Sequence, residues 1–216
     1  MKIETVTKYL TPELLDEATR RGNAIPAGIR NSITGGANRA HGALGELLVE
    51  AYLGDCSPPG SDVYDGDMLR LGKLLEVKTK IRAYRPQPDW AVHVAESSRH
   101  QRADILIFTS LLSRGLDRKE INGRDCHVRV GGIFRWNRPH GAFIVGWMDR
   151  EEFYGRADEV KAGDIWAAES GDKNAKAELV DCWKLPNSAL RPASDMLLQR
   201  AENKSAQSID AAIDGC

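Results

Sequence analysis

The chain has 216 residues, of which 42% are apolar and 28% charged, and its formal net charge is −1. This composition is typical of a soluble globular protein with one core of ordinary size. No run of about 18 apolar residues is present, which excludes a transmembrane helix. The near-neutral charge excludes a uniformly basic nucleic-acid-binding surface, so any contact with nucleic acid must come from a local basic patch.

We expect a single domain over residues 1–204. Residues 205–216 are polar, and we expect a flexible tail there. The first residues lack the basic-then-apolar pattern of a secretory signal, which predicts a cytoplasmic protein with no membrane partner.

A first helix is expected from residue 12 to about residue 21. Residues 11–13 supply a hydroxyl N-cap, a proline at the first helical position and an acid in the first turn. The Gly-Asn pair at 22–23 would end this helix.

Apolar residues at helical spacing predict a second helix over residues 37–53, with Gly54 just past its C-terminus. Gly42 and Gly45 lie three residues apart inside it and share one helix face. One interpretation is that this smooth face lies close to the sheet and directs Glu46 toward it. The other is that both glycines are simply tolerated and Glu46 is a surface residue.

Residues 64–80 contain the pattern that organises the rest. Two apolar-rich runs flank Leu71-Gly72, which predicts a β-hairpin with a two-residue turn. In that register Asp67 lies opposite Glu76, and Asp65 lies opposite Lys78. Because side chains alternate along a strand, all four of these charged groups would emerge on one face.

Two carboxylates facing each other across a hairpin repel and destabilise the pair. A divalent cation removes this penalty, because Mg²⁺ binds hard oxygen ligands a few Å apart. Lys78 adds a point charge that can hold an anion or polarise a water, and the combination suits metal-assisted attack of water on a phosphodiester. The alternative is an exposed hairpin of mixed charge, in which Lys78 offsets Asp65 and nothing binds. A register slip of one residue would also disperse the cluster.

The later elements are expected in this order: a loop over 81–89, a strand over 90–94, a short helical or turn segment over 97–102, a buried strand over 103–109, a strand over 142–147, a helix over 150–157 capped by Asp149, irregular structure over 164–186 with a short strand near 179–183, and a final helix within 188–204.

Residues 114–138 form the most basic region, with seven Arg or Lys against three acids. Phe134 and Trp136 flank Arg135 there, and basic charge with aromatic residues is compatible with a surface for the phosphate backbone. A solvated strand and loop would show the same pattern.

This order of motifs resembles the PD-(D/E)XK nuclease superfamily, the restriction-endonuclease-like fold. In that family a helix often carries a glutamate, a following strand carries an acid, and the next strand carries Glu-x-Lys. Glu46 matches the helical glutamate, Asp67 matches the first acid, and Glu76-Val77-Lys78 matches Glu-x-Lys. Asp65 is a neighbouring acid that would be the ligand if the register differs.

Two positions depart from the family pattern. Gly66 stands where a proline often precedes the first acid, and Gln101 is the only candidate for a glutamine that some relatives carry after the third motif strand. The segment 144–153 looks like the ending of several phage and restriction-type members. The likeness covers a core of about residues 37–160, and is weaker beyond residue 112.

The resemblance implies an α/β fold with a mixed central β-sheet flanked by helices. It also implies a Mg²⁺- or Mn²⁺-dependent DNA endonuclease that hydrolyses phosphodiester bonds. Asp67, Glu76 and the main-chain carbonyl of Val77 would ligate the metal, with Asp65 as the alternative acid. Glu46 would hold a second metal or orient a water.

In the same scheme Lys78 would position and help deprotonate the attacking water, or stabilise charge on the phosphate. Contacts to backbone phosphates would come from Lys80, Arg82, Arg85 and Arg135. The expected partner is DNA, and the resemblance also allows a homodimer that cuts both strands. The alternatives are a non-catalytic DNA-binding or assembly protein on the same fold and a structure-specific nuclease acting on Holliday junctions or flaps.

Overall fold

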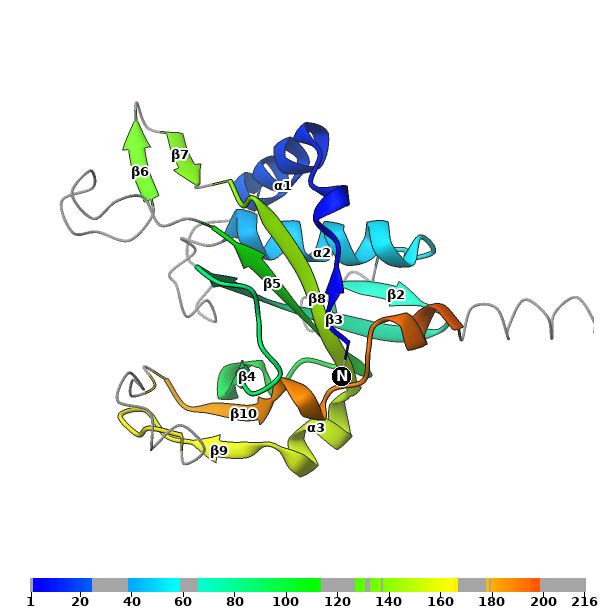
Figure 1. The fold of residues 1–216 in the computed structure, drawn as a ribbon, viewed down its shortest axis with the longest axis vertical. Helices are drawn as coiled ribbons and strands as arrows, with labels where there is room; N and C mark the ends of the chain where they lie inside the picture. Colours follow the sequence, from blue (N-terminus) through cyan, green and yellow to red (C-terminus); the bar gives the residue numbers. More distant parts are fainter. Residues whose placement is uncertain are drawn as a thin grey trace, which may run out of the picture.

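The computed structural model describes residues 2–24, 39–58, 66–113, 127–130, 133–136, 138–166, 178 and 180–198, with only the backbone at 39, 127–130 and 133–136. Within them the protein is a mixed α/β fold with a central five-stranded sheet in the order β1-β8-β5-β3-β2. Helices cover one face of this sheet, and a smaller sheet with a short helix lies on the other side (Figure 1). No described helix is long and apolar enough to cross a membrane.

The central sheet is built from both neighbouring and distant parts of the chain. Its strands are β1 (Glu4–Thr5), β2 (Met68–Arg70), β3 (Lys73–Arg82), β5 (Ile105–Leu112) and β8 (Gly141–Asp149). β3 and β5 are parallel, and the other pairs are antiparallel, so the sheet is mixed as predicted. The apolar run at 103–109 becomes the middle strand because it is buried on both faces.

The predicted hairpin forms with the predicted turn. Arg70 pairs with Lys73 and Met68 pairs with Leu75, so Leu71-Gly72 is the two-residue loop. Leu71 has φ 50° and Gly72 has φ 73°, the positive values that a type I′ turn requires. The second arm is longer than expected, because β3 continues to Arg82 into the segment predicted as loop.

The helical layer consists of α1 (Pro12–Ala24) and α2 (Arg39–Leu53) (Figure 1). α1 packs on α2, and α2 packs on β3 and β5 of the sheet. The Thr11 hydroxyl accepts a hydrogen bond from the Leu14 N–H at 3.2 Å, as expected of an N-cap. The predicted end of α1 is wrong, because the helix passes through Gly22. A Cβ at Gly22 would lie 2.7 Å from the Ala40 nitrogen, so this glycine serves close helix packing instead.

The second layer contains β4 (Ala91–Ala95), β10 (Cys182–Pro186), β9 (Asp158–Val160) and α3 (Arg150–Arg156). The strand predicted at 90–94 exists, but it pairs with β10 in a separate three-stranded sheet and not with the central one. Leu106, Phe108 and Val145 of the central sheet pack here against Phe153 and Leu185. The 3₁₀ turns η1 (Thr7–Tyr9), η2 (Glu96–Ser98) and η4 (Asn187–Ala189) connect these layers.

Other expectations are met in part. Asp149 stands at the N-cap of α3 but makes no capping bond there, because its carboxylate accepts from Arg191. Residues 194–198 are helical, within the predicted final helix. β6 (His127–Val130) and β7 (Ile133–Trp136) form a hairpin in the basic region. The rest of that region from 114 to 126, and the predicted tail 205–216, lie outside the described residues.

The close approach of α2 to the sheet depends on one glycine. A Cβ at Gly45 would lie 1.9 Å from Thr79 Oγ1 and 2.8 Å from Thr109 Oγ1, whereas one at Gly42 meets nothing within 4 Å. The interpretation of a close glycine contact therefore holds for Gly45, whereas Gly42 is simply tolerated. The difference matters because Glu46 follows Gly45 directly.

Gly45→Ala should destabilise the protein by about 1–3 kcal/mol, because the added methyl group overpacks the contact between α2 and the sheet. Gly42→Ala is the matched control on the same helix. It should raise the free energy of unfolding by up to about 1 kcal/mol, since alanine favours a helix over glycine. Urea denaturation measures both, and equal effects of the two substitutions would contradict this account of α2.

Candidate active site

β3 divides its side chains between the two layers of the fold. Thr79 faces α2, where its hydroxyl accepts a hydrogen bond from Thr109 at 2.9 Å. Glu76 and Lys78 pair in register with residues of β5 that belong to the second core, and so lie on the opposite face. Their side chains meet there, because Lys78 Nζ donates to Glu76 Oε1 at 2.6 Å.

Asp67 reaches this group from outside the regular hairpin. The ladder ends at Met68, so the prediction that Asp67 pairs directly opposite Glu76 is wrong. Its N–H donates to the Leu75 carbonyl at 2.7 Å, and its Oδ2 accepts from the Val77 N–H at 2.6 Å. The carboxylate is therefore fixed on the β3 backbone beside Glu76.

Gly66 explains the missing proline at this position. A Cβ on Gly66 would lie 2.4 Å from the Leu75 carbonyl oxygen, closer than any side-chain carbon can approach. A glycine is needed here because the backbone just before Asp67 passes close against the β3 backbone at Leu75.

Three carboxyl groups share this part of the molecule. Burial raises the pKa of Asp67 well above its ordinary value, and the charges of Glu76 and Glu46 raise it further, against the Val77 N–H and Lys78, which lower it. Burial also raises the pKa of Glu46, with a second contribution from Glu76. Glu46, Asp67 and Glu76 therefore lie close enough to affect one another's ionisation, and together with Lys78 we call them the carboxylate cluster.

Lys78 is held by two further oxygens. Its Nζ donates to Gln101 Oε1 at 2.8 Å and to Ser98 Oγ at 3.2 Å. Gln101 was the only sequence candidate for the glutamine that some relatives carry, and it contacts the Glu-x-Lys lysine. Ser98 carried no sequence signal, because a single serine in a turn is common and only the fold places it here.

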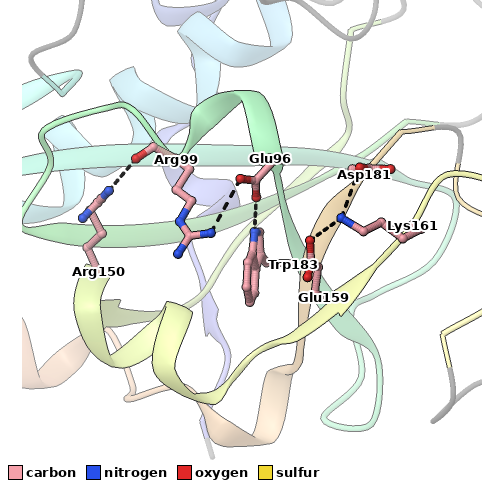
Figure 2. Close-up of polar contacts among 7 residues, drawn as sticks. All are labelled: Glu96, Arg99, Arg150, Glu159, Lys161, Asp181 and Trp183. Atoms are coloured by element: carbon pink, nitrogen blue, oxygen red, sulfur yellow. Dashed lines mark hydrogen bonds and ion pairs between the residues drawn. The ribbon is translucent and has the colours of Figure 1, made fainter.

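The segment 96–101, which carries both oxygens, is held in place by contacts of Glu96 and Arg99 (Figure 2). Glu96 accepts a hydrogen bond from Trp183 Nε1 and lies 3.6 Å from Arg99 Nη1. The Arg99 guanidinium lies 4.9 Å from the centre of the Trp183 ring. The main-chain carbonyl of Arg99 accepts a hydrogen bond from the Arg150 guanidinium. β10 and α3 thereby fix the turn that positions Lys78.

Glu76 has the properties expected of a cation ligand. Only 4% of its surface is exposed, and its Oε2 has no hydrogen-bond partner among the described residues. No three His, Cys, Asp or Glu side chains in the described ranges form a ready metal-binding group. Mg²⁺, however, usually takes one or two carboxylates and keeps several waters, so an orphaned carboxylate oxygen beside two other carboxyls fits it.

The described side chains that were predicted to contact phosphates also contact other groups of the protein. Lys80 Nζ lies 3.2 Å from His93 Nδ1, and Arg82 donates to the Ala91 carbonyl at 2.9 Å. The Arg85 guanidinium lies over the Phe143 ring, 5.4 Å from its centre. The side chain of Arg135 and the whole of Asp65 lie outside the described residues.

No protein-family model, curated protein or solved structure matches this chain. The chemistry of the site therefore follows from the contacts of its own residues.

The raised pKa of Asp67 predicts a pH-dependent stability in metal-free protein. A carboxyl with a raised pKa binds its proton more tightly in the folded state, so stability is greatest below its ordinary pKa and falls as pH rises through the folded value. Asp67→Asn should remove this fall. At pH 8 in EDTA it should raise the free energy of unfolding, because a neutral amide replaces a carboxylate whose charge the fold disfavours.

Urea denaturation at several pH values provides the measurement, with the exposed Asp89→Asn as the control. The control should leave the pH profile unchanged. If the stability of Asp67→Asn depended on pH as that of the wild type does, or if this variant were less stable at pH 8, Asp67 would carry no unfavourable negative charge in the folded protein.

Proposed function

We propose that this protein is a metal-dependent deoxyribonuclease that hydrolyses phosphodiester bonds as an endonuclease, on a restriction-endonuclease-like core. The observation that carries the proposal is the carboxylate cluster, in which the buried Glu76 of β3 and the half-buried acids Asp67 and Glu46 influence one another's ionisation beside Lys78. The order helix, hairpin and buried parallel strand agrees with the family resemblance. The proposal includes cytoplasmic action on DNA and a homodimer that cuts both strands.

The oxygens suited to a divalent cation are those of Asp67 and Glu76, together with the main-chain carbonyl of Val77. The orphaned Oε2 of Glu76 supports this assignment, because a buried carboxylate oxygen without a partner is unfavourable. Glu46 would hold a second ion or orient a water. Mg²⁺ or Mn²⁺ bound there supplies Lewis-acid polarisation of the phosphate and a more acidic water.

Lys78 acts as a fixed positive charge at the phosphate. Its three N–H donors all have oxygen acceptors, in Glu76, Ser98 and Gln101, which suits an ammonium group. This arrangement favours stabilisation of negative charge on the phosphate over removal of a proton from water. The bond to Ser98 is the longest of the three, and it is the one that a phosphate oxygen would replace.

Lys78→Ala should lower the rate of Mg²⁺-dependent cleavage of supercoiled plasmid by about a hundredfold or more, because one preorganised charge is removed. DNA affinity measured in EDTA should stay within a few-fold of wild type. Lys73→Ala provides the control, since Lys73 is an exposed lysine at the far end of the same strand.

Unchanged cleavage by Lys78→Ala would overturn the assignment of the site. Absence of cleavage by the wild type with either metal, with DNA binding retained, would instead indicate the non-catalytic DNA-binding protein.

A further inference from the structure

A pocket lies beside the carboxylate cluster, between the central sheet and β4. Its walls include Lys80, Arg82, His93, Phe108, Ser110 and Val145, and it begins at Lys78. Its lining combines the cations Lys80 and Arg82 with the apolar side chains of Phe108 and Val145, and the positive charge favours a small anion. None of the proposed metal ligands takes part in it.

The spacing of residues along β3 sets the distance between the pocket and the proposed reaction centre. Lys80 follows Lys78 by two residues on the same face of β3, so the two lysines are about 7 Å apart along the strand. That spacing is comparable to the separation of neighbouring phosphates on a nucleic-acid strand. Lys80 pairs in register with Ser110 of β5, so these two side chains lie next to each other.

Ser110 is the observation that points to a ligand. Its side chain is fully buried, and its Oγ has no hydrogen-bond partner among the described residues. A buried hydroxyl without a partner is unfavourable, and the large majority of buried side-chain polar atoms have one. An acceptor atom entering the pocket would complete this hydrogen bond.

His93 supplies a second neutral donor. Because an ammonium group can only donate, Lys80 Nζ donates to His93 Nδ1, and the ring proton is then on Nε2. Burial, followed by the charges of Lys80 and Lys184, lowers the pKa of His93 to about 4, while Glu178 opposes this effect. The ring is therefore uncharged at neutral pH and offers an N–H.

The surrounding charge favours an anion. Lys184 lies opposite His93 in the β4–β10 register and forms an ion pair with Glu178 at 2.8 Å. Arg82 is held at the rim over the Trp90 ring, with 4.7 Å between the guanidinium carbon and the ring centre. The cations Lys78, Lys80 and Arg82 line the pocket, and its described lining includes no acid.

We propose that the pocket binds a phosphate group of the DNA strand, the one next to the phosphate that is cleaved. Lys80 provides the charge, and Ser110 Oγ–H and His93 Nε2–H provide the hydrogen bonds. The neighbouring position rests on the proposed function, because it takes Lys78 as the reaction centre. The chemistry recognised is a phosphate, whether internal or at the end of a strand.

The test measures binding in EDTA, where no cleavage takes place, by the fluorescence anisotropy of a short labelled DNA oligonucleotide. Ser110→Ala should weaken binding about tenfold, because a hydrogen bond to a charged group is lost. Its thermal unfolding temperature should not fall, since the substitution removes only an unpaired hydroxyl. Ser97→Ala, at an exposed serine, should bind like wild type.

Lys80→Met tests the charge separately. It should lower the slope of log Kd against log salt by about one, as expected for one phosphate contact. Lys73→Met should leave the slope unchanged. Inorganic phosphate should raise the unfolding temperature of the wild type more than that of Ser110→Ala.

Oligonucleotides with a 5′-phosphate or a 5′-hydroxyl distinguish the two sources of phosphate. A larger Ser110→Ala effect with the 5′-phosphate assigns a terminal phosphate, and an equal effect assigns an internal one. Wild-type affinity of Ser110→Ala for both oligonucleotides would overturn the pocket assignment, even if the plasmid is cleaved. A binding defect in Ser110→Ala without any plasmid cleavage would keep the phosphate pocket and reject the nuclease.

Discussion

Repulsion among Glu46, Asp67 and Glu76 is the constraint on which the rest of the structure depends. Burial and mutual repulsion raise the pKa of Asp67 and of Glu46, so the free protein holds negative charge where it is unfavourable. Such a cluster persists only because the surrounding packing fixes its members. Gly45 lets α2 lie on the sheet, and Gly66 lets the chain pass close to the β3 backbone, each where a methyl group would not fit.

The two layers of the fold contribute different parts of the site. The central sheet and its helices supply the acids, while the turn at 96–101 supplies the oxygens that hold Lys78. That turn is in place because β10 and α3 anchor it through aromatic and ionic contacts. β4 then contributes Val92 and His93 to the lining of the pocket, and Lys78 belongs to both the pocket and the carboxylate cluster.

The sequence predicted the parts that local signals control. The Leu71-Gly72 turn fixed the register of the hairpin, and Thr11 marked the start of α1, because turn and cap preferences depend on a few adjacent residues. Parts that depend on distant packing escaped prediction. Neither the sheet to which β4 belongs nor the approach of Ser98 and Ser110 to the site leaves a local pattern. The very short strands β1 and β9 were missed for the same reason.

Calorimetric titration of metal-free protein with Mn²⁺ tests the central claim most directly, because it asks whether the carboxylate cluster holds a cation. The account predicts saturable binding that is lost in Glu76→Gln and retained in Glu13→Gln, which changes an exposed acid in α1. The glutamine preserves the shape of the side chain, so a loss would reflect the missing charge. Absence of binding by the wild type, or equal binding by Glu76→Gln, would contradict the account.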